Sequence, residues 1–382
     1  MSVDIYWRIA MEGDQKSLYE PGSTRGGFAP HLSGGVAPGR NRNSGADDGF
    51  THADYMAEVV RASEESGFVG GLLPSFPHTD DPWAAAATLA AESRNYRFMV
   101  AFQPGFLHPV QAARMSATLQ KATGGRLVYN IISGGGGPAQ LWWGDTTGHD
   151  DRYARTSEFL DVLKGVWTGD GLFQHDGCFY QVTDGGLPPA LAGQPFPEIF
   201  FSGSSPAAIE AAGRHADYYL SWLEPFEALA AKFAAVRERS PKPPKFAVRI
   251  DILARETEEE AWDVIRRGWA GLPEEGAEGS AAEREGGASG DSVGWRRSQD
   301  FTAGADGSHR ALEVAPNVWG GFHRLRPGPA FGLVGDYRQV ADRLNELIAL
   351  GVDAFILAGV PHLEEARRVG RHVLPLLKGN PQ

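Results

Sequence analysis

Short runs of apolar residues alternate along the chain with longer segments in which apolar positions recur every three to four residues. The apolar runs are centred near residues 5, 70, 99, 129, 200, 219, 250 and 356, and an amphipathic segment follows each of them. Continuously apolar strands of this length are typical of parallel sheets that are covered on both faces. Eight strand–helix units predict a (β/α)8 barrel rather than an open, doubly wound sheet.

Two segments interrupt this alternation. Residues 20–49 are rich in Gly, Ser, Pro and Asn, and residues 271–310 are dominated by Gly, Glu, Ala and Ser. Neither has the apolar periodicity of a core element. We therefore predict a glycine-rich insertion loop at 20–49 and a mobile lid or insertion over 271–330. Because the strand–helix alternation resumes after each segment, we assign residues 1–382 to a single barrel domain.

One strand–turn–helix unit has the features of a phosphate-binding site. An apolar strand at 199–201 is followed by a turn of small residues: Ser202, Gly203, Ser204 and Ser205. Pro206 then occupies the place of a first helical residue. Backbone N–H groups at a helix start bind phosphate dianions, although serine is also favoured in an ordinary helix cap. The absence of a lysine after Gly203 favours a cofactor with one terminal phosphate over a nucleoside triphosphate.

The chemistry of a (β/α)8 barrel is located at the carboxyl ends of its strands. The polar and aromatic residues expected there are Glu12, Ser75, His78, Thr79, Gln103, Asn130, Ser133, Trp222, Glu224, Arg249, Asp251 and His362. Two further arginines, Arg324 and Arg326, lie on the predicted lid. A mixed set of this kind, approached by glycine-rich segments, suits a flat heteroaromatic cofactor with a phosphate tail better than it suits a hydrolytic site.

Arg249 interrupts an otherwise apolar strand. A buried guanidinium must be paired, and Asp251, two residues further on, faces the same side of the strand. Two interpretations remain open: an internal ion pair across the barrel mouth, or a cation that recognises an anion. His362, at the start of the last helix, is equally open to a structural and a functional interpretation. His108, which precedes Pro109, is expected to cap a helix.

Composition excludes several classes of function. The net charge of −12 argues against a nucleic-acid partner, and the single cysteine, Cys178, excludes a disulfide framework and a cysteine-based metal site. His78, Asp80 and Asp81 have no matching cluster at another strand end, so no metal is expected. No predicted strand is followed by a Gly-x-Ser-x-Gly elbow, and no Gly-x-Gly-x-x-Gly fingerprint follows the first strand. The chain has no apolar run of about 20 residues and no leader pattern, so we expect a cytoplasmic protein.

Several motifs together resemble a known family. They are YNIISG at 129–134, FSGSS at 201–205, YLSWLEP at 219–225, PNVW at 316–319, LVGD at 333–336 and PHLEEARRVG at 361–370, with shorter matches at 7–14, 152–153, 248–250 and 254–257. The chain resembles the bacterial-luciferase-like flavin monooxygenases, most closely the reduced-FMN-dependent alkanesulfonate monooxygenases. The resemblance extends over nearly the whole chain, apart from residues 20–49 and part of the second insertion.

The resemblance implies a TIM barrel that obtains reduced FMN (FMNH2) from a partner NAD(P)H-dependent flavin reductase. It further implies that the enzyme uses O2 to oxygenate a small organic substrate. For a sulfonate, C–S cleavage would yield an aldehyde and sulfite. Relatives associate through their outer helices, which implies a homodimer or homotetramer.

The resemblance also assigns roles to individual residues. Ser204, Ser205 and Tyr153 would hold the FMN phosphate, with Ser202, Gly203 and Gln103 in the same cofactor-binding set. Asn130 and Ser133 would contact the isoalloxazine ring or the ribityl chain. Arg249, Arg326 and Trp222 match residues near the reacting flavin and substrate.

Four positions depart from the sulfonate enzymes. Glu12 and Asp251 replace histidines, Thr79 replaces a cysteine, and Val360 replaces a tyrosine. Carboxylates at 12 and 251 should weaken the binding of a bare sulfonate near Arg249 and would instead suit hydroxyl or amine groups. Two alternatives therefore stay open: a deazaflavin (F420)-dependent oxidoreductase on the same fold, and a non-catalytic flavin-binding barrel.

Overall fold

The computed structural model describes most of the predicted barrel. The described residues are 3–9, 11, 52–75, 79–134, 140–141, 143–169, 171–240, 242–270, 293–302, 308–325 and 328–379. Glu12, His78 and Arg326, the predicted loop 20–49 and residues 271–292 of the predicted lid lie outside them.

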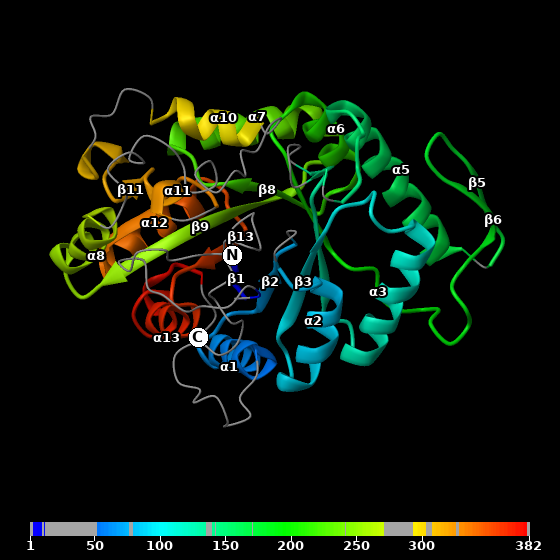
Figure 1. Ribbon diagram of the computed structural model, residues 1–382, viewed down its shortest axis with the longest axis horizontal. Helices are drawn as coiled ribbons and strands as arrows, with labels where there is room; N and C mark the ends of the chain where they lie inside the picture. The colour runs from blue at the N-terminus through cyan, green and yellow to red at the C-terminus, as the bar shows by residue number, and fades with distance from the viewer. Residues whose placement is uncertain are drawn as a thin grey trace.

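Eight parallel strands close into a barrel, which confirms the predicted fold (Figure 1). Around the barrel they are β1 (Asp4–Arg8), β2 (Gly70–Leu73), β3 (Arg97–Phe102), β4 (Leu127–Ile131), β7 (Ile199–Ser202), β8 (Tyr218–Trp222), β9 (Lys245–Arg255) and β13 (Ala354–Ala358). The barrel closes because β13 pairs with β1 on one side and with β9 on the other.

Helices surround the barrel. They are α1 (His52–Glu65), α2 (Pro82–Leu89), α3 (Pro109–Thr123), α5 (His149–Thr168), α6 (Pro206–His215), α7 (Phe226–Arg239), α8 (Glu258–Ala270), α12 (Tyr337–Ala349) and α13 (His362–His372). Their apolar faces pack on alternate strand residues, such as Trp7 and Tyr129, in the larger core cluster. As predicted, His108 caps α3, and its Nδ1 accepts a hydrogen bond from the backbone of Val110 at 3.3 Å.

The other strand residues fill the barrel interior. This second cluster includes Tyr6, Met99, Val128, Phe200 and Ala247. Because successive strand side chains point to opposite faces, residues two positions further along the same strands also point inward, nearer the carboxyl end. Arg8, Ala101, Asn130, Ser202 and Arg249 have this orientation. The strand alternation therefore directs several polar side chains to the mouth of the barrel.

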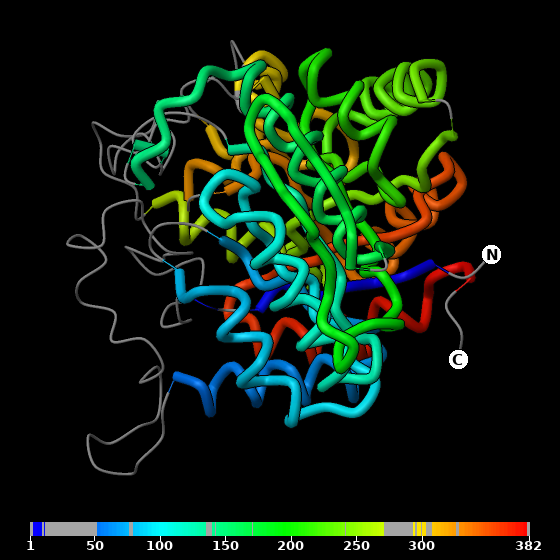
Figure 2. Tube along the Cα trace, turned by 90° about the vertical axis from the view of Figure 1, so that its right-hand side faces the viewer, coloured from blue at the N-terminus to red at the C-terminus, as the bar shows by residue number. Residues whose placement is uncertain are grey.

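Several elements were not predicted from the sequence. Strands β10 (Glu313–Ala315), β11 (Val318–Trp319) and β12 (Gly332–Asp336) extend the sheet beyond β9, and β5 (Phe173–Asp176) pairs with β6 (Gln181–Gly185). Within the predicted lid lie α10 (Val293–Asp300) and α11 (Phe322–Leu325). Single 3-10 turns occur at Ala90–Glu92, Arg310–Leu312 and Leu374–Leu376. The β5–β6 hairpin lies on the outer side of α5, toward the viewer in Figure 2.

The described part of the predicted lid thus contains regular structure that its composition did not indicate. It lacks an apolar stripe, yet α10 buries the side chain of Ser298 and is joined to the barrel by an ion pair. In the described part of the chain, no helix has both the length and the apolar character needed to cross a membrane.

Candidate functional site

The predicted phosphate turn connects β7 to α6. Ser205 has extended backbone angles, its Oγ accepts a hydrogen bond from the backbone of Ala208 at 3.2 Å, and Pro206 is the first helical residue. The predicted helix start is confirmed, and Ser205 acts as an ordinary cap. Capping by one hydroxyl still leaves other N–H groups of the first turn directed out of the helix.

Gly203 has a backbone conformation and surroundings that require glycine. Its φ is +148°, and a Cβ atom there would lie 2.4 Å from Ala208 Cβ and 2.8 Å from the Tyr153 hydroxyl. The turn, the first turn of α6 and Tyr153 on α5 therefore approach one another closely.

Two buried tyrosines flank this turn. The Tyr219 hydroxyl donates to the Gly203 carbonyl at 2.6 Å. Burial raises the pKa of Tyr219, and a hydrogen bond with Ser204 opposes this only partly. Burial likewise raises the pKa of Tyr153 against a hydrogen bond with Ser205. Both phenols are therefore neutral near pH 7, and the structure groups Tyr153 with Ser204 and Ser205 as the family resemblance implied.

The side chains of Asn130, on β4, and Ser133, just after β4, have different surroundings. Asn130 is buried and inward-facing, and its Oδ1 atom has no hydrogen-bond partner among the residues that the structure describes. Ser133 instead lies 3.1 Å from the Thr156 hydroxyl on α5, toward the helix that carries Tyr153. A buried amide oxygen without a partner is costly, so Asn130 is a candidate to form a hydrogen bond with a ligand.

Arg249 and Asp251 form the internal ion pair that was one of the two interpretations. Their side chains are buried, and Arg249 Nη2 lies 3.5 Å from Asp251 Oδ1. This pairing does not exclude anion recognition, because a guanidinium has five N–H donors.

Arg8 belongs to the same region but was missed from the sequence. It is buried at the end of β1, and its Nη1 lies 3.0 Å from His362 Nε2. The argument that singled out Arg249, an arginine at an inward position of an apolar strand, applies equally to Arg8. His362 is buried as well, so the structure places it at the barrel mouth.

The remaining predicted residues line the same end of the barrel. Ser75 donates to Gln103 Oε1 at 3.2 Å, which joins the ends of β2 and β3, and Thr79 donates to a backbone carbonyl at 3.3 Å. Trp222 pairs in register with Arg249 and keeps 38% of its surface exposed. Val360 is buried. The Arg324 guanidinium lies 5.6 Å from the centre of the Trp269 ring on α8.

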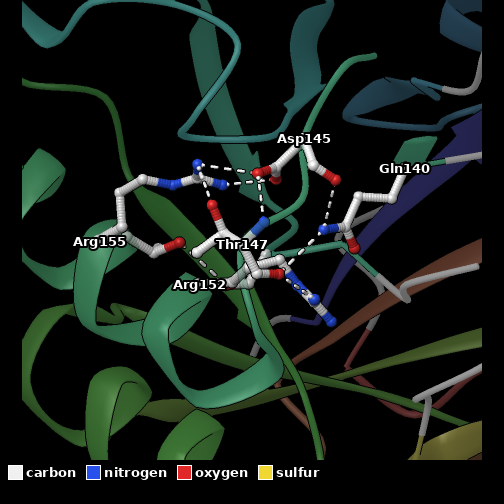
Figure 3. A network of polar contacts seen from close by, with 7 residues as sticks. Gln140, Asp145, Thr147, Arg152 and Arg155 are labelled. Atoms are coloured by element: carbon white, nitrogen blue, oxygen red, sulfur yellow. Dashed lines mark hydrogen bonds and ion pairs between the residues drawn. The ribbon is translucent and has the colours of Figure 1, made fainter. Parts of the chain in front are cut away.

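A network of polar contacts connects the loop after β4 to the start of α5 (Figure 3). It was not predicted from the sequence. Asp145 accepts hydrogen bonds from Arg155 at 2.7 and 3.1 Å, and Arg152 Nη1 donates to the Thr147 carbonyl at 2.8 Å. Gln140 donates to the Asp145 and Thr147 carbonyls at 3.0 and 3.1 Å. These contacts involve residues of a loop, so no periodic sequence pattern could have predicted them. Because Arg152 precedes Tyr153, the network fixes the start of the helix that carries this phenol.

No group of three His, Cys, Asp or Glu side chains in the described ranges is arranged to hold a metal ion. The site contains the turn at Gly203, which leads into α6 and is flanked by the phenols of Tyr153 and Tyr219. Polar side chains lie beside it at the mouth of the barrel. The sequence model of the luciferase-like monooxygenases matches residues 33–354. The chain belongs to this family.

Solved structures of low sequence identity share the fold. A riboflavin lyase, determined with modified FMN and riboflavin, has a TM-score of 0.70 at 18% identity, covering 100% of this chain and 94% of the other. An EDTA monooxygenase from Chelativorans sp. BNC1 has a TM-score of 0.67 at 20% identity, with coverages of 98% and 93%. An F420-dependent secondary alcohol dehydrogenase has a TM-score of 0.63 at 15% identity, with coverages of 99% and 100%.

Proposed function

We propose that this member of the luciferase-like monooxygenases is the oxygenase of a two-component system. It would use reduced FMN, supplied by an NAD(P)H-dependent flavin reductase, and O2 to oxygenate a small organic substrate. The observation that carries the proposal is the Gly203 turn at the start of α6, which the hydroxyls of Tyr153 and Tyr219 flank. We infer a homodimer or homotetramer by analogy with relatives of this fold.

The residues present fit FMN. The turn offers helix N–H groups and small hydroxyls for one terminal phosphate. The phenol of Tyr153 remains protonated and can donate to that phosphate, because burial raises its pKa. Asn130 supports the same assignment from inside the barrel, where its buried Oδ1 could accept a hydrogen bond from an N–H group of a flavin ring or from a ribityl hydroxyl.

When bound, reduced FMN would supply the two electrons that activate O2. The role of this chain's own residues is then to orient the substrate and to exclude water. Arg249 would hold an anionic group of the substrate, while Asp251 keeps the guanidinium in place. His362, held by Arg8, would supply or accept a proton at its ring. Trp222 would present an aromatic face to the substrate from the end of β8.

We propose an alkanesulfonate or related organosulfur compound as the first substrate class to test. In that reaction the C–S bond breaks, one atom of O2 enters the aldehyde, and the other leaves as water. The products are the aldehyde, sulfite, oxidised FMN, water and one proton. Asp251 beside Arg249 argues for a substrate that also carries a hydroxyl or amine group, because the Asp251 carboxylate repels a bare sulfonate.

A second candidate is hydride transfer with F420, since an F420-dependent alcohol dehydrogenase has the same fold. The turn favours FMN, because F420 has a longer phosphate-linked tail.

An oxygen-electrode assay distinguishes oxygenation with reduced FMN from hydride transfer with F420. In this assay a flavin reductase and NAD(P)H supply reduced FMN. The assay is run with a panel of sulfonates, hydroxy- and aminosulfonates among them, and with sulfite detection. Substrate-dependent oxygen uptake with sulfite release would support the full proposal. Uptake that yields only hydrogen peroxide with every sulfonate would remove this substrate class. Substrate turnover with reduced F420 under anaerobic conditions would overturn the monooxygenase assignment.

A further inference from the structure

A buried carboxylate lies between two cations next to the phosphate turn. Glu224 follows β8, Lys232 is on α7, and Arg297 is on α10. Arg297 Nη2 and Nε lie 2.7 and 3.2 Å from the two oxygens of Glu224. Lys232 Nζ contacts one of the same oxygens and donates to the Ser221 hydroxyl at 3.0 Å.

The charges of this group do not cancel. Burial would raise the pKa of Glu224, but its contacts with Arg297 and Lys232 outweigh burial and lower it, so Glu224 is a carboxylate at neutral pH. Burial lowers the pKa of Lys232, and its contact with Glu224 opposes this shift. With Lys232 protonated, one carboxylate and two cations leave one net positive charge. Without Lys232, Glu224 would neutralise Arg297 and the group would exert little attraction on an anion.

Arg297 also has N–H donors that Glu224 does not use. Glu224 occupies the edge of the guanidinium formed by Nε and Nη2, whereas Nη1 has no hydrogen-bond partner among the described residues. The side chain is 37% exposed, so a ligand can reach it. A guanidinium held along one edge presents the other in a fixed direction, which is the geometry that suits a phosphate.

The group is electrostatically coupled to the phosphate turn. The positive charge of Arg297 lowers the pKa of Tyr219 and the negative charge of Glu224 raises it. Tyr219 in turn hydrogen-bonds Ser204 and the Gly203 carbonyl. Strand β8, which carries Tyr219 and leads to Glu224, pairs in parallel with β7, which leads to the phosphate turn, so the ends of the two strands are neighbours.

We propose that Arg297 is a positioning cation for the phosphate of the cofactor, with Glu224 as the anchor that holds its guanidinium and Lys232 as the source of the excess charge. This inference rests on the proposed function. It implies that the docking of α10 and the binding of a phosphate monoester strengthen each other, because coupling between two binding events is reciprocal. A flavin without a phosphate would not benefit.

The test compares the binding of FMN and of riboflavin, which lacks the phosphate, by quenching of flavin fluorescence. We expect Arg297→Ala to weaken FMN binding about tenfold, the loss typical of one charged hydrogen bond, and to leave riboflavin binding within about twofold. FMN binding by the variant should also depend less steeply on salt. Arg297→Lys, which keeps the charge without the planar fork, should retain part of the preference for FMN. Arg296→Ala, an exposed neighbour on the same helix, should change neither affinity.

Equal weakening of FMN and riboflavin by Arg297→Ala would show a purely structural role and overturn the inference. Unchanged binding of both would also overturn it, while a wild-type preference for FMN would leave the proposed function standing. Failure of the wild-type protein to prefer FMN over riboflavin would instead remove phosphate recognition, and with it both proposals.

Discussion

At the scale of single residues, Gly203 determines the shape of the phosphate turn. We expect Gly203→Ala to weaken FMN binding by at least about tenfold, because the new Cβ would lie within 3 Å of both Ala208 Cβ and the Tyr153 hydroxyl. An affinity titration with oxidised FMN measures this. Gly193→Ala is a matched control, since Gly193 also has positive φ but has open space around its Cβ position. Wild-type affinity in Gly203→Ala would refute the role of the turn.

Arg249 is expected to act in the reaction and not in the binding of FMN. We expect Arg249→Ala to reduce substrate-dependent turnover by about a hundredfold or more and to change FMN affinity by less than about threefold. The reason is that Arg249 lies in the barrel mouth and pairs with Asp251, whereas the phosphate turn lies beyond β7. Steady-state kinetics and a flavin titration on the same sample are the measurements, with circular dichroism as a check on folding. Full activity in the variant would exclude the proposed role.

Single residues were predictable where local chemistry is distinctive. The Ser205 cap, Pro206 and the inward arginine of β9 could be read from neighbouring residues and strand alternation. Arg8 could have been found by the same strand alternation as Arg249. Arg297 and Lys232 could not be assigned roles in this way, because their shared partner, Glu224, belongs to another element and is 73 positions from Arg297. The family resemblance added Tyr153, which no local pattern singles out.

At the scale of elements, the loop between β4 and α5 depends on Asp145. Burial would raise the pKa of Asp145, but hydrogen bonds from Arg155 and Thr147 outweigh burial and hold the pKa at about 2, below the ordinary value of 3.8. A carboxyl group with a lowered folded-state pKa stabilises the fold above the unfolded value and loses this contribution as the pH falls through the folded value.

We therefore expect Asp145→Asn to destabilise the protein by about 1 kcal/mol at pH 7, a value reduced for solvent screening. The difference from wild type should shrink as the pH falls from about 4 to about 2. Denaturant unfolding at several pH values measures it. A difference that stays constant over this range would contradict the account.

The β5–β6 hairpin is fastened to α5 by one carboxylate. Glu158 accepts hydrogen bonds from the backbone N–H groups of Cys178, Phe179 and Tyr180 at 2.8 to 3.1 Å, and its Oε1 lies 3.2 Å from His175 Nε2. Burial alone would raise its pKa, but these contacts lower it. Amides bound to one carboxylate should exchange slowly with solvent.

We expect Glu158→Gln to accelerate hydrogen exchange at residues 178–180 by about tenfold or more, because a neutral amide accepts less strongly than a carboxylate. Glu210→Gln, on the exposed side of α6, should leave exchange at these residues unchanged. Hydrogen exchange followed by mass spectrometry resolves the hairpin. Equal protection in the wild type and in Glu158→Gln would show that the strand pairing alone holds it.

The strands and helices of the barrel were predictable because periodicity reports burial directly. The hairpin was missed because β5 alternates between partly buried and exposed residues and β6 has only isolated buried positions, so neither strand has a continuous apolar run. Strand β12 was missed because its five residues, Gly332–Asp336, include two glycines and an aspartate and so form no continuous apolar run.

At the scale of the whole molecule, the barrel gathers residues from all parts of the chain at one end. Arg8 and His362 lie 354 positions apart in sequence, yet they meet because β1 and β13 are neighbours. The fold thus explains why a site of this kind could be outlined from strand ends before any contact was known. A protein determined with modified FMN and an F420-dependent protein share this architecture, so the residues at the strand ends, and not the fold, decide which cofactor binds.

The most direct test of the central claim is an anaerobic equilibrium titration of the protein with reduced FMN and, in parallel, with reduced F420. The account predicts that reduced FMN binds at least about tenfold more tightly, and that admitting O2 to the FMN complex oxidises the flavin. Tighter binding of reduced F420, or no binding of reduced FMN, would contradict it.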